Sequence, residues 1–197
     1  MTEPLICDFS KPQNNEQLTD YIGVKDECKL LIEASLPENR YRFYRQHKIP
    51  KLGKNSKNKY RLVWEIINND LLQANKNFAV NFGKFVYSKK YIHKSALGYI
   101  SKKGIRDNAE VHSGASFLLR DDLANFFPSI SSAMLIKRFK ELELNDNIIQ
   151  TLIGFLTIDE FLPLGFPSSP MLANIVCKEL DEKISDLGWI KLANATF

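Results

Sequence analysis

The sequence has 197 residues, enough for one full domain with a substantial hydrophobic core. Hydrophobic residues make up 44% and charged residues 25%, which excludes a disordered chain and a membrane-protein composition. No apolar run reaches about 18 residues and the N-terminal segment has no basic start, so we predict a cytoplasmic protein without membrane contact. The three cysteines are widely spaced and form no Cys-x-x-Cys pair, which argues against zinc and disulfides.

The net charge of +4 is unevenly distributed along the chain. Between Tyr41 and Arg106 there are 16 Lys and Arg residues but only two acids, an excess of +14, whereas the remaining residues carry −10. A basic block of this kind can neutralise nucleic-acid phosphates and release their counterions. A solvated basic face explains the same charges equally well, so charge alone leaves both interpretations open.

The first part of the chain is predicted to hold two helices and a hairpin. Residues 13–35 carry a roughly helical apolar pattern, which predicts one helix. A turn rich in Lys and Asn then separates two short aromatic or β-branched segments, which predicts strands near 42–49 and 59–64. A long helix is expected over about 65–88, and it has more apolar residues than one amphipathic face needs. We therefore expect this helix to pack on two sides.

A short apolar run, ASFLLRDDL, follows the basic block and predicts a buried strand at residues 115–123. Asp121 and Asp122 end this run. A carboxylate at the end of a buried strand can hold Mg²⁺, which takes carboxylates, waters and substrate phosphates as ligands. Two such ions can activate a 3′-hydroxyl and stabilise pyrophosphate in nucleotidyl transfer. Acids also end strands for purely structural reasons, so the spacing alone leaves this metal site open.

The remaining residues predict three helices. Ser131 and the serine after it are good N-caps for a helix through about Leu144, and a second helix is expected over 146–156. A segment with three prolines and one glycine follows. In it Ser169 can cap, and the proline after it can open, a last helix through about Ile184.

Four motifs follow one another along residues 40–185: KIPKLGKNSKNKYRLV, GYISKKGIRDNAEVH, DDLANFFPSI and LPLGFPSSPMLANIV. The first two resemble the fingers hairpin and the Asn-Ala-x-x-His fingers segment of reverse transcriptases of the retron and group II intron type. The third and fourth resemble the first and second palm motifs of the same family. Four motifs in family order are far more specific than any one of them.

The resemblance implies an α+β fold of the right-hand polymerase type, with an antiparallel palm strand packed against helices. It divides the chain into an N-terminal helical extension (1–40), fingers (41–114) and a partial palm (115–197), without a thumb. The family's third motif, Tyr-x-Asp-Asp, does not occur in this sequence. We therefore expect the chain alone to be inactive, whether it is a fragment, one part of a split enzyme or a degenerate protein.

The resemblance assigns the metal site and a sugar contact to the first palm motif. Asp122 would be the catalytic carboxylate that ligates both Mg²⁺ ions of the complete enzyme, and Leu123 would offer its backbone carbonyl. Asp121 falls at a variable position and is predicted to be a bystander or a salt-bridge partner. Phe127 matches a steric gate, an aromatic ring beneath the sugar that excludes a 2′-hydroxyl. At least one of Phe126 and Phe127 is expected in the core.

The resemblance also assigns a nucleotide grip. Arg61 and Lys51 match fingers positions that hold the incoming triphosphate, and the planar guanidinium suits phosphate oxygens. Gly165 would let the backbone approach the nucleotide closely. Leu164 stands where most relatives have Gln, so its nucleotide contact would lack a hydrogen bond.

Further residues are predicted to contact nucleic acid, because they are basic or occupy family motif positions. These residues are Lys54, Lys57, Lys59, Lys102, Lys103, Arg106, Asn108 and Ser168.

The resemblance predicts an RNA-directed DNA polymerase of retron or phage-defence type. Its partners would be an RNA template, a DNA primer and deoxynucleoside triphosphates, with a structured non-coding RNA and a defence effector protein as further candidates. Two other classes stay open. A non-catalytic RNA- or DNA-binding module needs only the basic block, and a template-independent DNA polymerase of phage-exclusion type would fit the loss of the Gln at Leu164.

Overall fold

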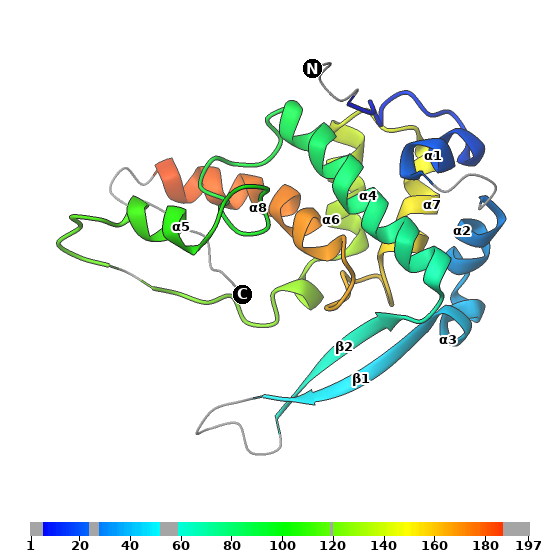
Figure 1. Cartoon of the computed structure of the whole chain (residues 1–197), viewed down its shortest axis with the longest axis horizontal. Helices are drawn as coiled ribbons and strands as arrows, with labels where there is room; N and C mark the ends of the chain where they lie inside the picture. The colour runs from blue at the N-terminus through cyan, green and yellow to red at the C-terminus, as the bar shows by residue number, and fades with distance from the viewer. Residues whose placement is uncertain (1–5, 24–27, 52–58, 119, 187–197) are drawn as a thin grey trace.

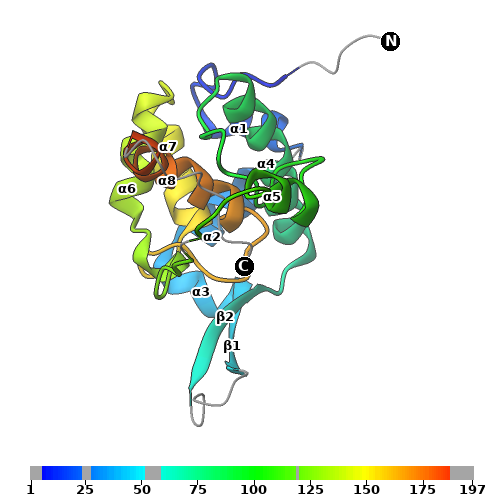
Figure 2. The ribbon, with the colours of Figure 1, turned by 90° about the vertical axis from the view of Figure 1, so that its left-hand side faces the viewer.

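The computed structural model describes residues 6–23, 28–51, 59–118 and 120–186. The helices are α1 (Asn15–Ile22), α2 (Cys28–Ser35), α3 (Arg40–Phe43), α4 (Asn69–Ser88), α5 (Ile105–Val111), α6 (Ser132–Glu141), α7 (Asp146–Leu156) and α8 (Ser169–Asp186). Two short 3₁₀ turns, η1 (Pro37–Asn39) and η2 (Phe127–Ser129), and two strands, β1 (Tyr44–Pro50) and β2 (Tyr60–Ile66), complete the described elements. The two strands project from a body of helices (Figures 1 and 2).

Helix α4 runs through the centre of the helical body, between α1 and α8 (Figure 1). Phe82 in this helix is fully buried, and its ring centroid lies 5.0 Å from that of Phe9 and 5.6 Å from that of Phe139 in α6. Full burial of one such side chain contributes about 1.5–3 kcal/mol. The excess of apolar residues thus indicated correctly that α4 packs on two sides.

The expected single helix over 13–35 is wrong, because the first helix ends at Ile22. Gly23 has a φ of +74° and its N–H donates to the carbonyls of Thr19 and Asp20, at 2.9 and 3.3 Å. A left-handed glycine with such bonds is a common way to end a helix. Helix α2 begins at Cys28 and packs on α7, and α1 contacts α4 and α7, so both N-terminal helices share the core of the body.

The predicted hairpin is confirmed, with strand bounds one or two residues later than expected. The strands are antiparallel, with Cα partners running from Tyr44 with Ile66 to Pro50 with Tyr60. Because β2 continues to Ile66, helix α4 begins at Asn69 rather than near 65. The side chain of Asn68 caps this helix by accepting a hydrogen bond from the Leu71 N–H at 2.9 Å.

The predicted buried strand at 115–123 is wrong. Its described residues form no strand and are exposed, with Phe117 at 95% exposure. A buried strand needs neighbours for its backbone N–H and C=O groups, and the described part of the chain offers none there, since its one sheet is β1 with β2. The protein is a mixed helix-and-sheet fold with a small antiparallel sheet, which confirms the α+β class without the palm strand.

The three C-terminal helices are confirmed, with one correction. Helix α6 is capped by Ser131, whose side chain accepts from the Met134 N–H at 3.4 Å, and α7 has the predicted bounds. Ser169 does not cap α8: it is the first helical residue, and its Oγ donates to the Pro163 carbonyl at 2.6 Å. None of the described helices combines the length and apolar character that crossing a membrane requires.

Candidate nucleotide and nucleic-acid site

The turn that precedes α8 lies against the free edge of β2. The Trp64 N–H donates to the Leu164 carbonyl at 2.7 Å. Gly165 has a φ of +115°, and a Cβ atom on it would lie 2.8 Å from Cγ1 of Val63 and closer still to the Trp64 carbonyl oxygen. Only glycine fits such a contact. Gly165 thus lies close to strand β2, and its predicted close approach to a nucleotide stays a prediction.

The hairpin residue predicted to grip a triphosphate lies on the same face of β2 as the Val63 side chain in this contact. Side chains two apart on a strand share a face, so Arg61 lies on the face of Val63, whose side chain meets Gly165. Arg61 is exposed. Towards the hairpin tip the Lys51 N–H donates to the Lys59 carbonyl at 2.9 Å, which places these two cations opposite each other.

The predicted contacts at Lys54 and Lys57 lie outside the described residues. Lys59 is exposed, and Lys51 is half-buried. All other described Lys and Arg residues from Arg42 to Arg106 are exposed. The basic block therefore faces solvent, as phosphate binding requires.

Two of the basic side chains predicted to contact nucleic acid near α5 form ion pairs with acidic residues of this helix. Lys103 pairs with Asp107 at 3.1 Å, and Arg106 pairs with Glu110 at 2.9 Å. The Gly104 N–H and the Lys103 ammonium lower the pKa of the Asp107 carboxyl. Lys102 is exposed before the helix, and Asn108 lies half-buried within α5.

Asp122 is exposed in the coil that precedes η2. Its backbone N–H donates a hydrogen bond to Oδ1 of Asp121 at 2.8 Å. The Asp121 carboxylate is therefore bonded to the backbone of the next residue. The Asp122 carboxylate and the Leu123 carbonyl are oxygen donors of the kind that Mg²⁺ takes. Within the described ranges no three His, Cys, Asp or Glu side chains come close enough to share one ion. Asp122 and Leu123 could therefore supply only part of a magnesium ligand set, and their metal role stays a prediction.

The segment that follows Asp122 packs on α6 and α8. A groove of about 230 Å³ is lined by Leu123, Ala124, Phe126, Ser129, Ile130, Met134, Val176, Cys177 and Leu180. Phe126 is half-buried, whereas Phe127 is 7% exposed and belongs to the core. Both lie in a helical turn rather than in a strand-like run. The predicted sugar contact of Phe127 remains a prediction, and in this conformation the ring is not presented to solvent.

The family model described as "Reverse transcriptase (RNA-dependent DNA polymerase)" matches residues 49–191, a range that includes β2, Asp122 and the turn before α8. The chain belongs to the reverse transcriptase family. Its similarity to curated proteins points to the retron type within that family.

The chain is 34% identical over 125 residues to the retron Ec73 reverse transcriptase of Escherichia coli, with 57% of this chain and 39% of that protein covered. It is 38% identical over 89 residues to the retron Ec86 reverse transcriptase of the same organism, with 45% and 28% covered. The retron Mx162 reverse transcriptase of Myxococcus xanthus is 27% identical over 115 residues, with 49% and 24% covered. The matched part of the chain thus spans at most 39% of these relatives.

Two asparagines of this reverse transcriptase chain connect α8 and the turn before it to earlier parts of the chain, and the sequence did not reveal either role. Oδ1 of Asn75 in α4 accepts from the Ser168 N–H at 3.0 Å, and Nδ2 of Asn174 in α8 donates to the Gly98 carbonyl at 2.9 Å. Asn75 had a signal, since it interrupts a buried apolar helix face. Ser168 itself is fully buried, so its side chain offers no atom to nucleic acid in this conformation.

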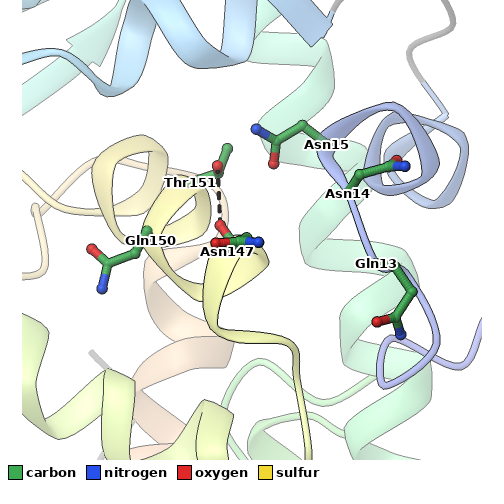
Figure 3. Close-up of a pocket in the computed structure, with 6 residues that line it drawn as sticks. All are labelled: Gln13, Asn14, Asn15, Asn147, Gln150 and Thr151. Atoms are coloured by element: carbon green, nitrogen blue, oxygen red, sulfur yellow. Dashed lines mark hydrogen bonds between the residues drawn. The ribbon is translucent and has the colours of Figure 1, made fainter.

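A second hollow, of about 390 Å³, lies between the start of α1 and α7 (Figure 3). It is lined by Gln13, Asn14, Asn15, Asn147, Gln150 and Thr151. The side chains of Asn14 and Gln150 point away from each other (Figure 3). None of its lining residues titrates, so this hollow offers no acid or base for catalysis.

Proposed function

We propose that the chain forms the fingers and the first part of the palm of an RNA-directed DNA polymerase of retron type. The N-terminal helices at 1–40 are an extension, residues 41–114 are the fingers and residues 115–197 are the partial palm. The observation that carries the proposal is the contact of the turn Leu164–Gly165 with β2. It brings the second palm motif beside the face of the hairpin that holds Arg61.

The incoming deoxynucleoside triphosphate would lie between these two segments. Arg61, with Lys51, would hold its phosphates, since a guanidinium offers paired donors to phosphate oxygens. Gly165 is exposed and has no side chain to keep a nucleotide at a distance. Leu164 would contribute van der Waals contact without a hydrogen bond.

Asp122, with the Leu123 carbonyl, would hold magnesium together with further carboxylates of the complete enzyme. Magnesium, when bound, activates the 3′-hydroxyl and stabilises the leaving pyrophosphate. One carboxylate cannot balance two divalent ions. We therefore expect residues 1–197 alone to synthesise no DNA.

The exposed cations between Arg42 and Arg106 support RNA template and DNA primer as partners. A structured non-coding RNA, a defence effector protein and a cytoplasmic location are part of the same proposal. The RNA and the effector protein follow from the resemblance of the four motifs to this family, and the location follows from the sequence.

Primer extension with the complete protein encoded by the gene tests the proposal. The reaction contains an RNA template, a DNA primer, magnesium and the four deoxynucleoside triphosphates, and its products are sequenced. We expect DNA complementary to the template. Products unrelated to the template would instead indicate template-independent synthesis. Salt-dependent RNA binding without any synthesis would indicate a non-catalytic binding module.

A further inference from the structure

Asn75 places a polar amide on the buried apolar face of α4. It is 0% exposed and lies between Ala74 and Phe78, which are buried as well. Burying an amide is unfavourable unless hydrogen bonds compensate for the lost water. The hydrogen bond that Asn75 makes is therefore the feature that needs an explanation.

The partner of Asn75 is the last residue before α8. Oδ1 of Asn75 accepts from the Ser168 N–H at 3.0 Å, across 93 residues of sequence. The first N–H groups of a helix have no acceptor within the helix, so a side chain from elsewhere can satisfy them. At the other end of the same turn the Leu164 carbonyl accepts from the Trp64 N–H at 2.7 Å. Both ends of the turn at 164–168 are thus fixed to fingers elements, one to β2 and one to α4.

The hydrogen-bonding groups at this place are only partly paired. Nδ2 of Asn75 and Oγ of Ser168 are buried, and neither has a hydrogen-bond partner within the described part of the chain. An unpaired buried donor is destabilising. A leucine would remove the unpaired amide donor but would leave the buried Ser168 N–H without its acceptor. The contribution specific to asparagine is therefore the oxygen that holds the Ser168 N–H in place.

We propose that Asn75 is a positioning residue for nucleotide binding. Its hydrogen bond to the Ser168 N–H fixes the turn at 164–168, so that Leu164 and Gly165 face the nucleotide whose phosphates Arg61 holds. Asn75 itself does not touch the nucleotide. This inference rests on the proposed function, because it assigns the turn to the nucleotide site of the polymerase.

Asn81 provides a matched control on the same helix. Its Nδ2 donates to the Tyr21 carbonyl at 2.9 Å, so it also joins α4 to a distant backbone group, but at the N-terminal helix α1. Asn75→Leu and Asn81→Leu remove one long-range hydrogen bond each. A purely structural role predicts the same kinetic result for both variants.

The test is steady-state primer extension by the complete protein, with the KM for nucleotide and the KM for template–primer measured separately. We expect Asn75→Leu to raise the nucleotide KM by about tenfold, the size of one missing hydrogen bond, with little change in the template–primer KM. Asn81→Leu should leave the nucleotide KM within about twofold of the wild type, a difference smaller than one hydrogen bond. If the leucine variant does not fold, Asn75→Ala and Asn81→Ala are compared in the same way.

Hydrogen exchange of the peptide that contains Ser168 provides a second readout that does not depend on activity. Asn75→Leu should speed exchange at 164–168, and Asn81→Leu should not. Equal nucleotide KM values in the two variants, with an active wild type, would overturn this inference and leave the proposed function standing. An inactive wild type would overturn both this inference and the proposed function. Faster exchange in Asn75→Leu would not rescue either, because it reports only the hydrogen bond from the Ser168 N–H to Asn75.

Discussion

Gly165 lies where the turn before α8 touches β2, and both its backbone and its surroundings exclude a side chain. Its φ of +115° is rarely adopted by other residues, and an added Cβ would overlap the Trp64 carbonyl. We expect Gly165→Ala to lower the free energy of unfolding by at least about 1 kcal/mol. It should also raise the nucleotide KM, because the turn must move away from the hairpin. Urea denaturation and primer extension measure the two effects.

Gly114 separates backbone strain from the contact with β2. It also has a positive φ, +77°, but no atom would lie within 4 Å of an added Cβ. Gly114→Ala should therefore show the cost of backbone strain alone. If Gly165→Ala loses no more stability than Gly114→Ala, the close contact between Gly165 and Trp64 does not contribute to the loss, which would contradict this prediction.

Helices α6 and α8 are joined by a cluster of charged side chains. The guanidinium of the buried Arg138 bonds Glu141 at 2.8 Å and Glu179 at 3.0 Å, and Lys137 bonds Glu179 at 2.8 Å. The hydrogen bond from Arg138, followed by that from Lys137, lowers the pKa of Glu179 from 4.5 to about 2. The cluster therefore requires the ionised form of Glu179.

This lowered pKa predicts how stability depends on pH. A carboxylate with a lowered pKa in the folded state stabilises the fold above its ordinary pKa, and the contribution is lost as the pH falls through the folded value. The free energy of unfolding should therefore decrease between about pH 4.5 and pH 2, and Glu179→Gln should make that decrease shallower. Urea denaturation at a series of pH values measures the slope.

Glu182 on the same helix is the control for Glu179. It forms a longer ion pair, at 3.7 Å, with Lys178 in the preceding turn. Exposed pairs of this kind contribute little to stability. Glu182→Gln should leave the slope unchanged, and an equal flattening in both variants would contradict a special role of the Arg138 cluster.

Elements with strong local signals could be predicted from the sequence. Helical periodicity indicated α4 and α7, and two β-branched segments around a polar turn indicated the hairpin. The expected helix over 13–35 is wrong because Gly23 adopts the left-handed conformation and ends the first helix, which the apolar periodicity does not indicate. The expected strand at 115–123 failed because strand formation depends on a neighbouring strand, which a local apolar run does not specify.

The same limit applies to the candidate site. The roles predicted for Asp122, Arg61 and Gly165 came from the resemblance of the motifs to the family, and these roles stay predictions. The motifs could not show that Gly165 meets β2 or that Asn75 holds the Ser168 N–H, since both contacts join segments about a hundred residues apart. Such contacts are fixed by the packing of α4 and the hairpin, not by the local sequence.

At the scale of the whole molecule, the described cations of the basic block are exposed to solvent, except for the half-buried Lys51. Lys59 and Arg61 on the second arm of the hairpin are exposed, and no acid among the described residues forms a salt bridge with either. We expect Lys59→Gln with Arg61→Gln to weaken RNA binding and to make its salt dependence shallower. On single-stranded RNA, the slope of log affinity against log salt should fall by about 0.7 for each phosphate that the protein no longer neutralises. Fluorescence anisotropy at several salt concentrations measures the slope.

Arg106 is a control for the same experiment, since its charge is already paired with Glu110 at 2.9 Å. Arg106→Gln should change the salt slope less than Arg61→Gln does. A larger change for Arg106 would place the main phosphate contact at α5 rather than on the hairpin.

Primer extension by the complete protein with Asp122→Asn and Asp121→Asn most directly tests the assignment of a polymerase site to this chain. Asn at 121 still accepts the hydrogen bond from the residue 122 N–H, whereas Asn at 122 removes the charge proposed to hold magnesium. We predict that Asp122→Asn lowers DNA synthesis on an RNA template by about a hundredfold or more, while Asp121→Asn remains active. Undiminished synthesis by Asp122→Asn would contradict the proposed site.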